Sequence, residues 1–403
     1  MEFSVAIYTG KNVPYDLGTK LLGLTLLERQ IKIAETFGAK EVVTVDETTE
    51  RDFSGKWLFV NGAFFIHKLA VEQQYFESSE DRFEKGGMFG FCDAENHRED
   101  ITAFLKNGVF PENISTFTGP GYRVVVDAKE KLKRLDFELF EEMRKPTNGI
   151  ISRSINMVMA IFLTRNLWIP LRFTPNMVTW CSIIIGVMSG FVAFSGSRLA
   201  IILGTLCAQI ASVIDDCDGK VARLTYKTSD FGQWLDTVGD SFVNTSLTIG
   251  LGYGLAHYYT ANPVSSAALQ PYLETWPIWI AWLSVAINWY HNFVSYFDVI
   301  VIRKTTNIFS FTFWFEKKDR VTKRVDLTAP IYAKMDLLNF LKYFSRRDCY
   351  LFVYFILALI GPAAMLGGYL ITAAFVIPVF FLTTIHIYFG IIKKMKKAWQ
   401  NVS

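Results

Sequence analysis

Four aspartates at helical spacing in the middle of the chain are its strongest candidates for chemistry. Asp215 and Asp218 are three residues apart and Asp236 and Asp240 are four apart, so each pair lies on one face of a helix. Both pairs fall in apolar segments, where an uncompensated carboxylate costs several kcal/mol. A divalent metal is the simplest compensation, and ligands that are all oxygen suit Mg²⁺ or Mn²⁺. The sequence therefore predicts a site for two divalent metal ions.

This arrangement suits the transfer of a phosphate group. Two metal ions can bridge a pyrophosphate, neutralise charge on its oxygens and align an attacking hydroxyl, whose proton one carboxylate takes. Three small residues, Gly219, Ala222 and Gly232, let two helices approach each other and leave room for a nucleotide. Arg223, at the end of the first helix, can contact a phosphate through its fork of donors.

The loop between the two helices, residues 225–230, is so short that the helices must run antiparallel. Counted from Lys227 in this loop, the four aspartates then lie at similar depth. An alternative is that the carboxylates are structural charges paired with Arg or Lys. Arg223 alone cannot balance four carboxylates, so the sequence favours the metal site.

The pattern D-x-x-D-G-x-x-A-R-(x8)-G-x-x-x-D-x-x-x-D, from Asp215 to Asp240, resembles the signature of the CDP-alcohol phosphotransferase (CDP-alcohol phosphatidyltransferase) family. The resemblance implies that an alcohol attacks the β-phosphorus of a CDP-linked donor and that CMP leaves. It implies that Asp215, Asp218 and Asp236 are metal ligands, and that Asp240 is the general base and a further metal contact. The residues implied to bind the CDP group are Asp215, Asp218, Gly219, Ala222, Arg223 and Gly232.

Two shorter matches accompany this signature. Thr174 and Pro175 begin a T-P-N that resembles the one before the family's first span, where Thr174 can cap a helix that Pro175 starts. Arg346 and Arg347 begin an R-R-D that resembles the opening of the fifth span in relatives fused to a soluble domain. The match implies that these arginines contact a phosphate on the acceptor or a lipid headgroup, and anchoring by the positive-inside rule is an equal alternative.

Composition indicates an integral membrane protein with a soluble part. The chain has 403 residues, of which 51% are hydrophobic, and its mean hydropathy is +0.24. Residues 302–348 hold eleven Lys and Arg and residues 257–275 hold none, which places the N-terminal domain, the site and the C-terminus on the cytoplasmic side of the cell membrane. Residues 150–171 are apolar but interrupted, and we expect an interfacial amphipathic helix there. Six transmembrane helices are expected at about residues 177–195, 199–224, 231–255, 276–302, 350–371 and 373–392.

Residues 1–145 alternate strands with helices, which predicts a cytoplasmic α/β domain with a mostly parallel sheet. The stretches that resemble sugar-phosphate nucleotidyltransferases are residues 20–31, 37–43 and 124–127. That family has a glycine-rich loop after its first strand, and residues 8–14 here hold one glycine. Ala63 takes the position expected for an acidic metal ligand, which leaves Asp127 as the remaining candidate. We therefore expect an inactive domain, a linker at residues 146–175 and a six-helix membrane domain at residues 176–403.

Together these features predict a metal-dependent membrane phosphotransferase that binds a CDP-linked donor, an alcohol acceptor and membrane lipid. Members of the resembling family are commonly homodimers, so we expect one. The donor is CDP-diacylglycerol or another CDP-lipid, giving a phospholipid, or a CDP-polyol such as CDP-inositol; the inactive domain favours the lipid. One alternative is a bifunctional enzyme that also makes CDP-inositol, and another is a cation transporter, although the sequence shows no internal repeat. With no nucleic-acid motif, a nucleic-acid partner is not expected.

Overall fold

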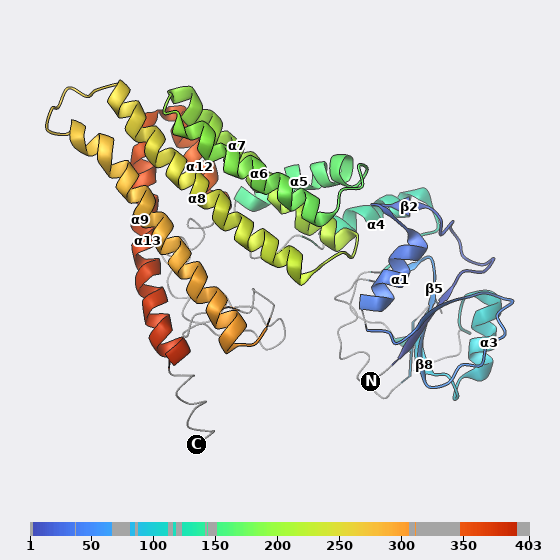
Figure 1. Ribbon diagram of the computed structural model, residues 1–403. Helices are drawn as coiled ribbons and strands as arrows, with labels where there is room; N and C mark the ends of the chain where they lie inside the picture. The colour runs from blue at the N-terminus through green and yellow to red at the C-terminus, as the bar shows by residue number, and fades with distance from the viewer. Residues whose placement is uncertain are drawn as a thin grey trace, which may run out of the picture. The chain divides into compact units, whose positions relative to one another are not determined.

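The computed structural model describes residues 3–36, 38–66, 81–84, 88–111, 116–117, 123–141, 143, 151–305, 311 and 347–392. The chain divides into two compact units. The first is Met1–Met143 together with Leu224–Tyr226, and the second is Arg144–Arg223 together with Lys227–Ser403. Figure 1 shows short strands and helices in the first unit and long helices in the second.

The first unit is built on a mixed sheet with the strand order β4-β1-β5-β8-β7-β9. Its strands are β4 (Val42–Val45), β1 (Ser4–Tyr8), β5 (Lys56–Asn61), β8 (Phe89–Asp93), β7 (Arg82–Glu84) and β9 (Thr116–Phe117). β1 pairs in parallel with β4 and β5, as predicted, but β8 is antiparallel to both β5 and β7. Smaller two-stranded pairs join β2 (Lys20–Leu21) to β3 (Leu24–Thr25) and β6 (Phe64–Ile66) to β10 (Arg123–Val125).

Alternating side chains of the central strands bury both faces of this sheet. Phe59 and its neighbours pack against Phe104 of α3 (Arg98–Asn107) on one face. On the other face, Ile7 belongs to the cluster that contains Ala34 of α1 (Leu26–Thr36). A further helix, α4, covers Lys129–Glu141. The unit is thus an α/β sandwich, as the alternation in the sequence predicted.

The second unit is helical. It begins with η1 (Ser152–Asn156), α5 (Met157–Leu163) and η2 (Thr164–Trp168), and continues through α6 (Pro175–Phe194), α7 (Arg198–Leu224), α8 (Asp230–Ala261), α9 (Gln270–Phe297), η3 (Asp298–Ile302), α12 (Arg347–Ile360), α13 (Pro362–His386) and η5 (Ile387–Ile392). Thr174 caps α6 and Pro175 occupies its first turn, as predicted. Figure 1 shows α6, α7 and α8 running alongside one another, and a hydrogen bond from Ser182 to the carbonyl of Ala211 links α6 to α7.

Three helices of the described chain are long and apolar enough to cross a membrane: Pro175–Phe194, Arg198–Leu224 and Pro362–Ile392. α8 and α9 have 32 and 28 residues but contain no stretch of equal apolarity. The first two match predicted spans within a few residues. The total of six spans stays a prediction.

The predicted boundary between the fifth and sixth spans, near residue 372, is wrong. α12 ends at Ile360 and α13 runs without interruption from Pro362 through that position. Gly361 has a φ of 153°, a backbone conformation that a side chain disfavours, and Pro362 has no N–H to continue the preceding helix. The Gly-Pro pair therefore decides where the chain turns.

Glycines bring the backbones of α6 and α8 into direct contact. A Cβ added to Gly190 would lie 2.1 Å from the backbone oxygen of Ser246, and one added to Gly250 would lie 2.1 Å from the backbone oxygen of Gly190. Such close approach of small residues is typical of helix packing in membranes. It fixes α8, which carries two of the motif aspartates, against α6.

The segment of residues 151–168 packs along α7. The buried Asn156 donates a hydrogen bond to Ser212 Oγ at 3.2 Å and accepts one from Gln209 at 2.9 Å. Its other face exposes apolar side chains such as Phe162. The segment is helical, as predicted. Its amphipathic character and its place at the membrane interface stay predictions.

Candidate active site

Three of the four motif carboxylates converge between α7 and α8. One oxygen each from Asp215, Asp236 and Asp240 lies within 4.8 Å of the other two. Asp236 and Asp240 stand one turn apart on α8, whose start is fixed by Ser229, because its hydroxyl accepts a hydrogen bond from Gly232 N at 3.0 Å. The antiparallel pair predicted from the short loop therefore brings these three aspartates together.

Asp218 does not belong to this group of three. Its carboxylate accepts a hydrogen bond of 2.5 Å from the hydroxyl of Thr179 on α6. One turn further along α6, the hydroxyl of Ser182 lies 3.5 Å from Asp215 Oδ1 and 3.0 Å from the carbonyl oxygen of Ala211. α6 thus supplies hydroxyls that orient Asp215 and Asp218. The sequence analysis missed them, although their spacing of three residues places them on one helix face.

A cation from a distant part of the chain enters the carboxylate group. The guanidinium of Arg347, at the start of α12, forms ion pairs with both Asp215 and Asp240. Its side chain is 18% exposed, so these pairs are largely shielded from water. The sequence-based expectation that Arg223 alone was available to balance the aspartates is therefore wrong. Arg346, the other arginine of the predicted pair, lies outside the described residues.

The donor set fits a hard divalent cation. Oδ1 of Asp236 is buried and has no hydrogen-bond partner among the residues that the structure describes. A buried charged oxygen without a partner is strongly unfavourable, and Arg347 brings a single positive charge to a group of several carboxylates. An ion bound by carboxylate oxygens would satisfy Asp236 and balance the remaining charge. The cluster can thus hold a divalent metal ion.

Four of the predicted CDP-binding residues lie toward the ends of α7 and α8 nearest the 225–229 loop: Gly219, Ala222, Arg223 and Gly232. The exposed Arg223 folds back along α7, so that a Cβ added to Gly219 would lie 3.2 Å from its Nη1. Ala222, in the last turn, accepts a hydrogen bond from Lys227 N at 2.9 Å. A Cβ on Gly232 would lie 3.0 Å from Oδ1 of Asn176. The contacts of these residues with CDP stay predictions.

Comparison with known proteins agrees with this geometry. The family model described as CDP-alcohol phosphatidyltransferase matches residues 172–379, just over half of the chain, and so covers every described residue of the carboxylate group. A protein of Aquifex aeolicus named "Bifunctional IPC transferase and DIPP synthase" is 30% identical over 145 residues, which is 34% of this chain and 33% of the relative. A protein of the same name from Archaeoglobus fulgidus is 32% identical over 120 residues, covering 30% and 23%.

A second kind of relative carries a different name. The "CDP-diacylglycerol–serine O-phosphatidyltransferase" of Helicobacter pylori is 38% identical over 71 residues, which is 18% of this chain and 29% of the relative. This chain therefore matches about a third or less of each of these relatives. The family model, the signature from Asp215 to Asp240 and the convergence of its carboxylates all agree. The chain belongs to the CDP-alcohol phosphatidyltransferase family.

Proposed function

We propose that this protein is an integral membrane enzyme that transfers a substituted phosphate from a CDP-linked donor to an alcohol and releases CMP. The observation that carries the proposal is the convergence of Asp215, Asp236 and Asp240, from two helices of the family domain, within 4.8 Å. Carboxylates grouped in this way suit metal-assisted phosphoryl transfer. The ion pairs with Arg347 supply only part of the balancing charge.

Two divalent ions, Mg²⁺ or Mn²⁺, would be held by Asp215, Asp218, Asp236 and Asp240. When bound, such ions neutralise charge on pyrophosphate oxygens and polarise the phosphorus. The hydroxyls of Thr179 and Ser182 orient Asp218 and Asp215 for this task. Zinc is not expected, because carboxylate oxygens favour hard cations such as Mg²⁺ and Mn²⁺.

The chain's own residues provide the proton transfer and the binding of the donor. Asp240 takes the proton of the acceptor hydroxyl as that oxygen bonds to the β-phosphorus. The bond from this phosphorus to the oxygen that bridges it to the α-phosphate breaks, and CMP leaves with that oxygen. Arg347 orients Asp240 through its ion pair, and Arg223 with Gly219 forms the surface for the CDP phosphates.

The donor is either a CDP-lipid or a CDP-polyol. The name of the Helicobacter relative favours CDP-diacylglycerol, and the names of the other relatives are compatible with a bifunctional enzyme. We favour the lipid donor, because the N-terminal unit lacks the acidic ligand that synthesis of a CDP-polyol needs at Ala63. Incubation of the full chain with CTP, Mg²⁺ and a sugar phosphate tests the bifunctional alternative, which predicts release of pyrophosphate.

The main experiment incubates the purified full chain with labelled CDP-diacylglycerol or CDP-inositol, Mn²⁺ and a panel of alcohols. CMP should form only when metal and a suitable alcohol are both present. Absence of CMP with every donor and alcohol would contradict the proposal. Cation flux through liposomes that contain the protein, without CMP release, would favour a transporter instead.

The site is proposed to face the cytoplasm and the enzyme to be a homodimer. The orientation is proposed from the distribution of Lys and Arg between the loops. The homodimer is proposed because members of the family are commonly homodimers. Labelling of single cysteines at Thr228 and at Ala267 from either side of sealed vesicles tests the orientation, and mass measurement by light scattering in detergent tests the dimer. Labelling of both positions from one side, or a monomeric mass, would refute the corresponding statement.

A further inference from the structure

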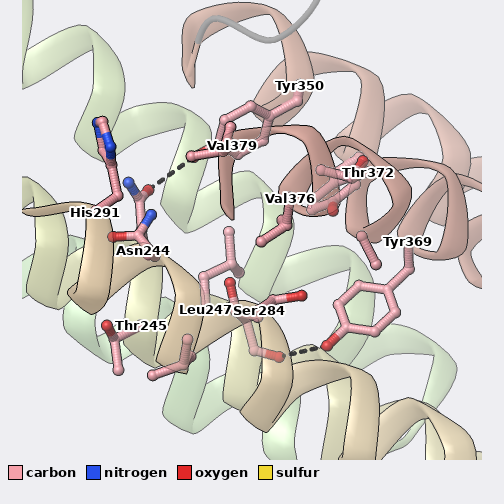
Figure 2. Close-up of a pocket in the computed structure, with 15 residues that line it drawn as sticks. Asn244, Thr245, Leu247, Ser284, His291, Tyr350, Tyr369, Thr372, Val376 and Val379 are labelled. Carbon is pink, nitrogen blue, oxygen red and sulfur yellow. Dashed lines mark hydrogen bonds between the residues drawn. The ribbon is translucent and has the colours of Figure 1, made fainter. Parts of the chain in front are cut away.

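A cavity of about 220 Å³ lies beside the carboxylate group, between α8, α9, α12 and α13. It begins one helical turn from the proposed base, because Asn244 follows Asp240 by four residues on α8. It also begins one turn from Arg347, because Tyr350 lines it from α12. Figure 2 shows the Tyr350 hydroxyl reaching Asn244, to whose Oδ1 it donates a hydrogen bond of 2.8 Å. The cavity and the carboxylates are therefore neighbours joined by two helices.

The lining combines polar side chains, among them His291, with a larger share of apolar surface. Each of the four helices contributes a hydroxyl or a carboxamide, and these groups alternate with aliphatic side chains such as Val376. Examples are Asn244 and Thr248 from α8, Ser284 and Asn288 from α9, Tyr354 from α12 and Thr372 from α13. Among the described residues that line the cavity there is no Asp, Glu, Lys or Arg. A charged ligand would have to lose its hydration here without gaining an opposite charge.

Hydrogen-bonding capacity remains in this lining. Within the described part of the chain, no hydrogen bond engages the NH₂ group of Asn244 or that of Asn288, although the oxygen of each accepts one. An acyl chain would leave such groups unsatisfied, whereas hydroxyl groups of a ligand can both donate to and accept from them. At about 220 Å³ the cavity is smaller than the pockets of about 300–1,000 Å³ that take drug-sized ligands, so its size suits a small molecule such as a polyol.

We propose that this cavity receives the body of the acceptor and that the acceptor is an uncharged polyol. The inference rests on the proposed function, since it assigns the substrate class for the same reaction. One helical turn, about 5.4 Å, separates Asn244 from Asp240 along α8. A small polyol can therefore hydrogen-bond the cavity with some hydroxyls while another lies against Asp240, where its proton is removed. The nucleophilic hydroxyl is thus selected by how the remaining hydroxyls are held.

The first test measures CMP release with a panel of acceptors at a fixed concentration of the preferred labelled donor. Glycerol, erythritol and myo-inositol represent uncharged polyols. Serine, glycerol 3-phosphate and inositol 1-phosphate represent charged alcohols, and diacylglycerol represents a lipid. We expect the lowest acceptor KM among the uncharged polyols. CMP release that prefers a charged alcohol or diacylglycerol overturns the inference but leaves the proposed function standing. If no acceptor gives CMP, the proposed function fails and the inference falls with it.

The second test removes hydrogen-bonding groups from the cavity at nearly constant volume. Thr248→Val and Asn244→Leu should each raise the KM of the preferred polyol about tenfold, the usual effect of losing one hydrogen bond to a ligand, and leave the KM of the CDP donor unchanged. Thr260→Val is the matched control, because Thr260 lies on the same helix and its hydroxyl donates to the carbonyl of Ala256. An unchanged polyol KM in both cavity variants would refute the assignment. An unchanged donor KM shows that these variants remain folded.

Discussion

The two units of this chain treat the polar groups of their candidate sites in opposite ways. In the helical unit, Oδ1 of Asp236 is buried without a hydrogen-bond partner among the described residues, and acidic groups outnumber Arg347. In the α/β unit, Asn61 at the end of β5 donates to the carbonyl of Gly108 at 3.0 Å and accepts from Ala63 N at 3.1 Å. Unbalanced charge is typical of a site that binds a ligand, whereas polar groups with a purely structural role hydrogen-bond to one another.

The space available at the two sites differs as well. In open α/β sheets, ligands bind beyond the carboxyl ends of the strands, which here follow β1 and β5. A Cβ on Gly10 would lie 2.1 Å from Glu47 Oε2, and one on Gly62 would lie 2.6 Å from a methyl group of Leu17. An acidic side chain and an aliphatic one thus lie against the glycines that follow β1 and β5. This supports the prediction that the α/β unit does not make a CDP-linked donor.

The remaining acidic candidate of the α/β unit is also engaged. Asp127 forms an ion pair of 2.5 Å with Lys131, one turn further along the chain, and its side chain is 39% exposed. A single exposed carboxylate with its own counterion holds Mg²⁺ weakly. By contrast, the helical unit brings three carboxylates together from two helices. A metal site needs several ligands close together, and the group of Asp215, Asp236 and Asp240 meets this requirement whereas Asp127 does not.

The sharpest way to break this comparison is to remove one carboxylate from each unit. Asp240→Asn should lower kcat for CMP release by about 10²- to 10⁴-fold, the usual contribution of a positioned general base. Asp127→Asn should leave CMP release within about twofold, because Asp127 lies in the unit that we propose to be silent. Steady-state rates with the preferred donor and acceptor make the measurement.

Asp216→Asn is the control for charge removal within the motif itself. Asp216 lies next to Asp215 but does not belong to the group of converging carboxylates. Its replacement should reduce the rate far less than Asp240→Asn does. Near wild-type activity of Asp240→Asn would remove Asp240 from its role as base.

The next largest effect concerns the balance of charge at the carboxylates. Arg347→Met should destabilise the metal-free protein by about 3 kcal/mol, the lower end of the range for buried ion pairs, because it breaks two partly buried pairs and removes the counterion of both aspartates. Added Mn²⁺ should raise the melting temperature more in Arg347→Met than in the unaltered protein, since the ion then replaces the lost positive charge. Thermal unfolding with and without Mn²⁺ is the measurement, and the exposed Arg223→Met is the control. Equal stabilisation by Mn²⁺ in all three proteins would argue against a metal at this group.

A smaller effect is expected where α6 supports α8. Gly250→Ala places a methyl group against the backbone oxygen of Gly190, and overpacking of this kind costs about 1–3 kcal/mol. The melting temperature should fall by several degrees. Gly367→Ala on α13 is the matched control, because an added Cβ there meets nothing within 4 Å among the described residues. If Gly250→Ala were as stable as Gly367→Ala, the close packing of α6 against α8 would be wrong.

The sequence predicted those features that depend on local spacing. The motif, the antiparallel pair of α7 and α8 and the cap at Thr174 follow from residues close together in the chain. Arg347 could not be placed in the same way, because 132 residues separate it from Asp215. The hydroxyls of Thr179 and Ser182 also depend on how α6 packs against α7. Gly361-Pro362 is a local signal for the end of α12. The sequence analysis missed it, because apolar residues on both sides of this pair looked like one continuous span.

The smallest predicted effect tests whether the contacts of Asp81 with Lys56 and His97 in the α/β unit are only structural. Burial raises the pKa of Asp81, but the Lys56 ammonium at 2.6 Å, the backbone N–H of Asp93 and His97 together hold that pKa below its usual range. A carboxyl group whose pKa is lower in the folded state stabilises the fold above its unfolded pKa of about 3.9, and this contribution is lost as the pH falls through the folded pKa. Lys56→Met should therefore lower the free energy of unfolding above about pH 4. Below that pH, the free energy of unfolding should change less with pH than it does in the unaltered protein. Hydrogen exchange of the β5 and β8 amides across this pH range is the measurement. The control is Lys11→Met, which removes an ion pair with Glu47. It should have little effect, because the Lys11 side chain is 90% exposed. CMP release by Lys56→Met is compared with the fraction of that variant that stays folded. If CMP release falls more than the folded fraction does, the α/β unit takes part in catalysis and the contrast between the two units fails.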